Sequence, residues 1–193
     1  LESSVVGAQL GSQAIASSLK AGAIGLAIVM VFMIVMYAVP GIAASLALAI
    51  YTTLVIATLY LFDITLTLPG IAGIILGIGM AVDANVIVFA RIREEIATGK
   101  SVQTSMKIGF QKAMSAILDG NITTLIASVV LMALGSGTVK GFAYTLMIGI
   151  ILSLFTAMVV TRYILYSLYA LGLKSEKLYG LSLIHISEPT RHS

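Results

Sequence analysis

The feature that most constrains the fold of this chain is the length of its segments without a charged residue. No Asp, Glu, Lys or Arg occurs in residues 21–62, 64–82, 120–139 or 141–161. A helix needs about 20 mainly apolar residues to cross the roughly 30 Å of hydrocarbon in a bilayer. The first segment is about twice that length, so we expect it to hold two spans. Pro40 and Gly41 lie near its middle and predict the turn, because proline lacks a backbone donor and glycine accepts unusual dihedral angles.

These segments predict an all-α membrane protein built on a bundle of five transmembrane helices. Unpaired backbone groups are not tolerated in lipid, and uninterrupted apolar runs do not suit a closed barrel, so each span must be helical. Only 10% of the residues are charged, against roughly 25% in soluble domains, which excludes a soluble enzyme. The runs are too long and too many for a secretory signal peptide. We place the five helices at about residues 19–39, 42–62, 68–90, 121–135 and 141–165.

The basic residues predict how the bundle is oriented. Outside residues 181–193, eight lie between the third and fourth spans or after the fifth span, and two lie on the other side. The eight are Arg91, Arg93, Lys100, Lys107, Lys112, Arg162, Lys174 and Lys177, and the two are Lys20 and Lys140. Because loops rich in Lys and Arg stay in the cytoplasm, we expect the third loop and the C-terminus to be cytoplasmic and the N-terminus to be external.

The two ends of the chain are expected to lie outside the bundle, which would occupy residues 19–171. The chain begins with Leu1 and not with Met, so residues 1–18 are interpreted as the end of a truncated external region. Residues 172–180 would form a short cytoplasmic tail. Residues 181–193, LSLIHISEPTRHS, break the composition and resemble a non-native extension, so we exclude them from the fold.

A helical pattern also occurs in the loop between the third and fourth spans. Ser101 is of a residue type favoured at helix N-caps, and apolar residues follow it at helical spacing with lysines between them. The apolar residues are Val102, Met106, Phe110, Ala113 and Ile117. The pattern predicts an amphipathic helix over about residues 101–117 that lies at the cytoplasmic membrane surface. Packing of this helix against a soluble partner is the alternative.

The chemistry that the sequence excludes narrows the function further. The chain has no cysteine, and both of its histidines lie in residues 181–193. A thiol nucleophile, a His-dependent catalytic triad and a zinc site therefore lack candidate residues, and we expect no catalytic residue, metal or cofactor. The sequence has no Walker A or dinucleotide fingerprint, and no basic stripe with aromatic residues of the kind that binds nucleic acid.

Four glycines in the third span are candidates for close helix packing. Gly70, Gly73, Gly77 and Gly79 could be compared with a phosphate-binding loop, but they lie inside an apolar span. Small residues at about four-residue spacing in a span let neighbouring helices approach closely. We therefore assign these glycines to helix packing.

Asp83 is the strongest candidate for a functional residue. It follows an uncharged run and precedes Arg91 by eight positions, which is roughly 12 Å of helix. A carboxylate at this depth costs about 2.5–3.5 kcal/mol on insertion scales, and such residues usually face the bundle interior and mark ion or proton paths. The alternative is a structural carboxyl group hydrogen-bonded to a neighbouring helix. Asn85 lies about 200° around the helix from Asp83, so we expect it to serve a different face.

Polar residues at the start of the fourth span are candidates for a supporting role. Asp119 is interpreted first as an N-cap or first-turn acid, which suits the helix dipole at that point. Asn121, Thr123 and Thr124 follow it. The two threonines can bond to their own helix or to a neighbour, and packing is the simpler role. Asp63, in the loop before the third span, is expected to be solvated and without function.

Two stretches of the sequence resemble a known family. Residues 77–113 read GIGMAVDANVIVFARIREEIATGKSVQTSMKIGFQKA, and residues 119–143 read DGNITTLIASVVLMALGSGTVKGFA. They resemble the fourth and fifth transmembrane helices of the SecD family, and the resemblance extends over about residues 5–171. The pairing of AVDAN with RIREE is the most specific part and favours SecD over the similar SecF. Ala90 departs from the family, which often has Glu there, so no role is carried over to that position.

The resemblance implies the transmembrane part of an accessory subunit of bacterial Sec protein export, within the resistance–nodulation–division superfamily. Such a subunit works in the bacterial inner membrane with SecF, a pseudo-symmetric partner bundle, and with the SecYEG channel. It pulls unfolded polypeptide outward after the motor SecA has acted, and it draws on the proton gradient. Asp83 matches the family's essential aspartate and would be the proton relay. The first helix and large external domain of the family are missing from this chain.

Two other interpretations stay open. One is half of another transporter of the same superfamily, which would move lipids or drugs with the same membrane acid. Only the external domain would separate it from SecD with certainty. The other is a non-transporting membrane scaffold, for which neutralising Asp83 should leave function intact.

Overall fold

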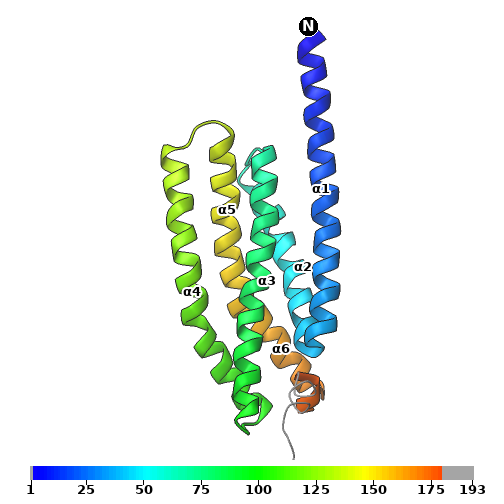
Figure 1. Cartoon of the computed structure of the whole chain (residues 1–193), viewed down its shortest axis with the longest axis vertical. Helices are drawn as coiled ribbons and strands as arrows, with labels where there is room; N and C mark the ends of the chain where they lie inside the picture. Colours follow the sequence, from blue (N-terminus) through cyan, green and yellow to red (C-terminus); the bar gives the residue numbers. More distant parts are fainter. Residues whose placement is uncertain (1, 180–193) are drawn as a thin grey trace, which may run out of the picture.

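The fold is a bundle of five long apolar helices. The computed structural model describes residues 2–179, and in them it contains helices and no strand. The helices are α1 (Glu2–Tyr37), α2 (Val39–Leu61), α3 (Leu68–Ala97), α4 (Val102–Leu134), α5 (Thr138–Phe155), the π-helical segment η1 (Thr156–Val160), α6 (Thr161–Ala170) and the short 3₁₀ turn η2 (Glu176–Tyr179). Because α5, η1 and α6 are continuous, five helices are long and apolar enough to cross a membrane. The predicted all-α bundle of five spans is confirmed (Figure 1).

Helix α3 is the centre of the bundle. It begins at Leu68, where the Thr67 hydroxyl accepts a hydrogen bond from the Gly70 N–H at 3.1 Å and Pro69 occupies the first turn. Both features are typical of a helix start. It contacts α1, α2, α4 and α5, which surround it on several sides in Figure 1. Any side chain that α3 exposes therefore lies on the one face that its neighbours leave uncovered.

The turn between α1 and α2 differs from the prediction. The chain reverses at Ala38, which has a φ of 48°, and α2 already begins at Val39. Pro40 lies in the first helical turn, where its missing N–H would have no partner in any case. Gly41 is needed because the α1 backbone lies close to it: an added Cβ would lie 2.0 Å from the Met33 carbonyl oxygen. Its role is therefore close packing and not an unusual dihedral angle.

The C-terminal end of α1 is bound to α3. A side-chain N–H of Arg93 donates a hydrogen bond to the Met36 carbonyl oxygen at 3.0 Å, which satisfies a backbone group at the end of α1. The Arg93 guanidinium also lies 4.6 Å from the centre of the Tyr37 ring, which in turn contacts Phe89. In the other direction, α1 continues as one helix through most of residues 1–18, which were predicted to lie outside the bundle.

The structure also differs from the prediction of a separate interfacial helix. Ser101 is the N-cap, as expected, but the helix that follows runs without a break to Leu134. The predicted apolar residues of 101–117 are all buried, in the same core cluster as Val88, Phe89 and Ile92 of α3. Gly109 permits this contact, since an added Cβ would lie 2.5 Å from the Ile92 side chain. The apolar face therefore packs on α3 and not on lipid.

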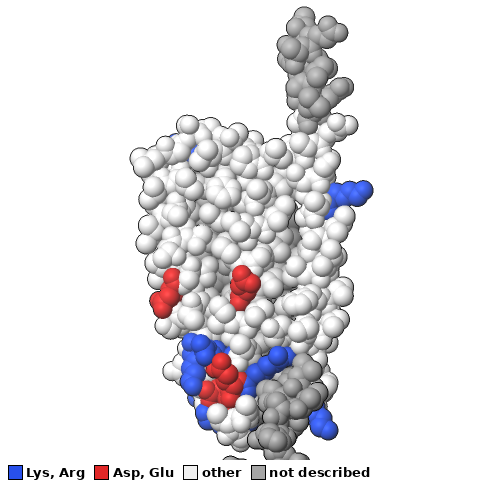
Figure 2. Space-filling model, in the orientation of Figure 1, with Lys and Arg blue, Asp and Glu red and all other residues white. Residues whose placement is uncertain are grey.

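Charged residues gather at the end of the bundle where α3 ends and α4 begins, which we call the basic end (Figure 2). Glu95 is buried there, and its carboxylate pairs with the ammonium groups of Lys100 and Lys112. This ion cluster ties the turn between α3 and α4 to both helices. The predicted tail folds back as far as Tyr179, whose buried hydroxyl donates to the Leu173 carbonyl oxygen at 3.0 Å. Residues 181–193 lie outside the described residues.

We predict that the basic end faces the cytoplasm, because loops rich in Lys and Arg resist crossing the membrane. The chain has no native cysteine, so single cysteines report position without background. In intact cells, a membrane-impermeant thiol reagent should label Ser136→Cys, between α4 and α5, and should label Thr98→Cys, after α3, only once the membrane is permeabilised. Ready labelling of Thr98→Cys from outside would reverse the orientation.

Candidate functional site

Asp83 and Asn85 lie on opposite faces of α3. Asn85 is 2% exposed and faces the bundle, whereas the Asp83 side chain lies on the exposed face. We expected Asp83 to face the bundle interior, toward the surface where SecF would dock; the first part of this prediction is wrong, because the neighbouring helices leave Asp83 exposed. The reason lies in the packing of α3, since its other faces are filled by neighbouring helices and carry the buried residues Gly77, Ala81, Ala84 and Val88.

The exposed face of α3 carries small residues on both sides of Asp83. Asp83 lies between Gly79 and Ala90 on this face, which also exposes Ala72, Ile75 and Leu76. An added Cβ at Gly79 meets nothing within 4 Å. Among residues 2–179 Gly79 therefore makes no close packing contact, although the sequence placed it with the packing glycines. A face of small residues at helical spacing is the kind that another membrane helix packs against closely.

Gly73 and Gly77 lie where α3 approaches α2 and α5 most closely. An added Cβ at Gly73 would lie 2.3 Å from the Thr145 hydroxyl and 3.2 Å from the Phe142 carbonyl oxygen. At Gly77 it would lie 2.4 Å from the Tyr51 hydroxyl and 3.6 Å from the Gly149 Cα. The Tyr51 side chain is fully buried, and its hydroxyl lies in the space left by Gly77 of α3 and Gly149 of α5.

Asp119 lies in the interior of α4, so it is not the N-cap or first-turn acid that the sequence suggested. Its side chain is exposed. Helices α3 and α4 are antiparallel, and Gly109 of α4 lies beside Ile92 of α3. Asp119 follows Gly109 by the same number of residues by which Val82 precedes Ile92, so Asp119 and Val82 are equally far from this contact. Asp119 and Asp83 therefore lie at about the same depth on adjacent helices. Figure 2 shows acidic groups that are set apart from the charges of the basic end and are surrounded by uncharged residues.

The other polar residues of the fourth span mostly bond to their own helix. The Asn121 side-chain amide donates to the Ile117 carbonyl oxygen at 2.7 Å, and the Thr123 hydroxyl donates to the Gly120 carbonyl oxygen at 3.2 Å. Thr124 is half-buried. Asn121 and Thr123 thus satisfy backbone groups, and the structure does not bring them to Asp83.

The sequence interpretation missed Thr161 and Glu95. The Thr161 hydroxyl donates a hydrogen bond to the Asn85 side-chain oxygen at 2.7 Å, and both residues are buried. The signal for this pair was a threonine near the end of the fifth apolar run. Glu95 was hidden within the charged RIREE stretch, where nothing in the spacing distinguishes a buried carboxylate from an exposed one.

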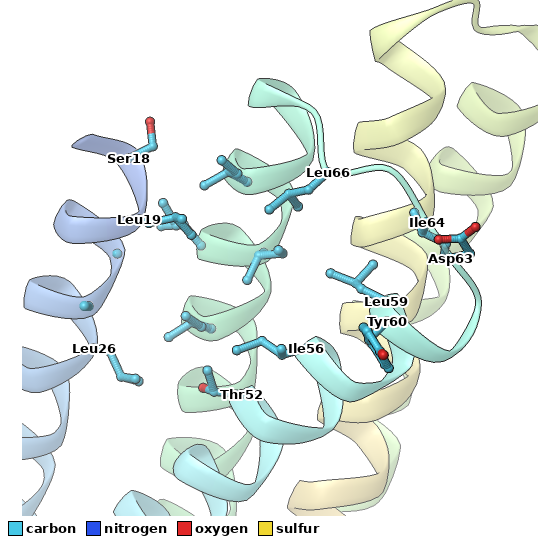
Figure 3. A pocket seen from close by; sticks show the side chains of 16 residues that line it. Ser18, Leu19, Leu26, Thr52, Ile56, Leu59, Tyr60, Asp63, Ile64 and Leu66 are labelled. Atoms are coloured by element: carbon cyan, nitrogen blue, oxygen red, sulfur yellow. The ribbon is translucent and has the colours of Figure 1, made fainter. Parts of the chain in front are cut away.

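A cavity of about 480 Å³ lies away from these residues, between α1, α2 and α3. Figure 3 shows Leu26, Ile56 and Leu59 among the apolar side chains that line it, with Tyr60 and Asp63 at one end. Asp83 does not line it. Residues 2–179 also bring together no cluster of acidic residues that could hold a metal ion. The exposed face around Asp83 is accordingly the better candidate site.

A family model, individual relatives and a solved structure all indicate the same family for this chain. The family model described as "Protein export membrane protein SecD/SecF, C-terminal" matches residues 1–170. The chain is 54% identical over 165 residues to the protein translocase subunit SecD of Synechocystis and 51% identical over 165 residues to that of Acidaminococcus fermentans. Each match covers 86% of this chain but only 35% and 40% of those relatives.

A solved structure has the same arrangement of helices. The crystal structure of SecDF from Thermus thermophilus, described as a translocon-associated membrane protein, superimposes with a TM-score of 0.82 at 37% identity. The match covers 85% of this chain and 23% of that one. The chain therefore spans well under half the length of the relatives that it matches.

Proposed function

The chain belongs to the SecD/SecF family of protein-export membrane proteins, and on that premise we propose that it is the energy-coupling membrane part of a SecD subunit. Its role would be to convert the proton gradient into movement that assists protein export, with Asp83 as the proton relay. The observation that carries this proposal is the position of Asp83, a carboxylate on the exposed face of a central helix that is long and apolar enough to cross a membrane.

The exposure of Asp83 supports a partner on that face. A carboxylate left facing lipid is unfavourable by several kcal/mol, so the face is expected to be covered in the assembled protein. SecF, the similar bundle that the sequence resemblance implies, fits a face of small residues that lets helices approach closely. Asp119, at about the same depth on α4, would lie at the edge of the same contact and is the second titratable group available to it.

The remaining parts of the proposal follow from the family. The subunit would reside in the bacterial inner membrane, act with SecYEG on unfolded polypeptide after SecA, and use the proton gradient in place of a cofactor. Three apolar helices that pack around α3 give the relay a rigid support, since α3 is fixed along its length by α2, α4 and α5. The decisive measurement is gradient-dependent export by a full-length SecD that carries Asp83→Asn.

Docking of SecF on the α3 face can be tested separately by cysteine cross-linking. Gly79→Cys in full-length SecD should form cross-links with a panel of single cysteines on SecF, because Gly79 lies on the exposed face one turn from Asp83. Ile151→Cys on α5 is the matched control, since Ile151 is also exposed but does not lie on α3. Cross-links from Ile151→Cys and none from Gly79→Cys would place SecF elsewhere.

A further inference from the structure

A buried hydrogen bond joins α3 to α6 close to Asp83. The Thr161 hydroxyl donates to the Asn85 side-chain oxygen at 2.7 Å, and the Asn85 amide donates to the Ala81 carbonyl oxygen at 3.0 Å. Thr161 is fully buried and Asn85 is 2% exposed, so water does not compete for either group. Asn85 follows Asp83 by two residues and lies on the opposite face of α3.

The helix that carries Thr161 is irregular immediately before it. Thr156–Val160 form a π-helical turn, and the Thr161 N–H bonds to the Thr156 carbonyl oxygen. Two buried hydroxyls nearby bond back to their own helix, Ser153 to Ile150 at 2.8 Å and Thr156 to Ser153 at 3.2 Å. Back-bonded Ser and Thr bend helices, and π-helical turns often occur at functional sites. The segment η1 is therefore the point at which the α5–α6 span can change its angle.

Helix α3 is held to this span in two different ways. Near Gly73 and Gly77 the contact with α5 is close, since an added Cβ at Gly73 would meet the Thr145 hydroxyl and one at Gly77 would lie 3.6 Å from the Gly149 Cα. At the depth of Asp83 the span is linked to α3 by this hydrogen bond and by apolar packing, since Ala84 and Val88 share a core cluster with Ala157 and Leu165. Rotation of α3 at Asp83 must therefore either break this bond or carry α6 with it.

We propose that Asn85 and Thr161 are positioning residues for Asp83. Their hydrogen bond sets the rotation of α3 about its axis and so directs the Asp83 carboxyl toward the partner face, while η1 lets α6 follow α3 when the carboxyl changes charge. This inference rests on the proposed proton-coupling function. The plain alternative is a hydrogen bond that stabilises the bundle and has no effect on Asp83.

The test compares Thr161→Val, which removes the hydroxyl and keeps the shape, with Thr161→Ser, which keeps the hydroxyl. Full-length SecD with SecF is reconstituted in lipid and treated with a hydrophobic carbodiimide, which modifies protonated carboxyls, over a range of pH. Mass spectrometry gives the extent of modification at Asp83. Thr161→Val should change the rate at a fixed pH by about threefold, the size expected from one interhelical hydrogen bond in a membrane. Thr161→Ser should follow the wild type.

A second readout measures the rotation of α3 directly. The Gly79→Cys cross-link to SecF should fall in yield in Thr161→Val and recover in Thr161→Ser. If Thr161→Val melts at a lower temperature but leaves both the modification profile and the cross-link unchanged, the bond is only structural and the proposal is overturned. Equal changes in the Ser and Val variants would also overturn it. Neither readout requires export, so normal gradient-dependent export by Asp83→Asn would refute the proposed function independently.

Discussion

Gradient-dependent export by full-length SecD that carries Asp83→Asn is expected to fall to the level of a SecD-deficient strain, while the protein still folds and associates with SecF. Asn occupies nearly the same volume as Asp and can form hydrogen bonds, but it cannot gain or lose a proton at any relevant pH. A membrane carboxylate is costly, and its change of charge can drive a switch only if each conformation favours a different protonation state. The measurement is complementation of the deficient strain, followed by export into the periplasm with and without a collapsed gradient.

Asp63→Asn is the matched control for this substitution. Asp63 is also an exposed acid, but it lies in the loop between α2 and α3, and its replacement should leave export unchanged. Normal gradient-stimulated export by Asp83→Asn would contradict the proton-relay role. Loss of expression of the variant would instead favour a carboxyl group that holds helices together and carries no proton.

The second large effect is expected on stability. Gly77→Leu should lower the melting temperature of the detergent-solubilised protein strongly, because an added Cβ already lies 2.4 Å from the Tyr51 hydroxyl and the rest of the leucine has no space. Overpacking of this kind typically costs about 1–3 kcal/mol and sometimes more. Gly79→Leu, two residues away on the open face, is the matched control and should melt close to the wild type.

Tyr51 provides a sharper form of the same experiment. The Tyr51 hydroxyl is buried without a hydrogen-bond partner in the described residues, and it is the atom nearest to the added Cβ. The double variant Gly77→Ala with Tyr51→Phe should therefore be more stable than Gly77→Ala alone. If Gly77→Leu melts at the wild-type temperature, the close contact between α2, α3 and α5 does not exist.

The number and type of the helices could be predicted because charge is nearly prohibited in hydrocarbon. Four uncharged runs, the first of which is long enough for two helices, indicate five spans. The start of α4 could not be predicted in the same way, because Lys107, Lys112 and Asp119 interrupt the apolar run. All three lie on the exposed side of one continuous helix whose other side packs on α3. A charged residue shows that its side of a helix is not packed in the core of this bundle, but it does not mark where the helix begins.

The depth of Asp83 could be predicted from its distance to Arg91, and the separation of Asn85 could be predicted from helical geometry. The direction of Asp83 could not, because it depends on which sides of α3 the other helices cover. The pairing of Asn85 with Thr161 joins residues far apart in the sequence and depends on the packing of α3 against the last span. Asp119 shows the same limit, since its depth beside Asp83 follows only from the contact between Gly109 and Ile92.

Helix α1 packs on the bundle over its second half and extends beyond it over its first half (Figure 1). It has 36 residues and is therefore about 54 Å long, well beyond the roughly 30 Å of hydrocarbon. Arg93 and the turn at Ala38 fix its C-terminal end, and Ile75 of α3 still contacts it at Gly22. The part that precedes Gly22 is about 30 Å long, so a tilt of about 10° there would move its far end by about 5 Å. A small change of angle beside α3 would thus become a larger displacement at the N-terminal end of α1.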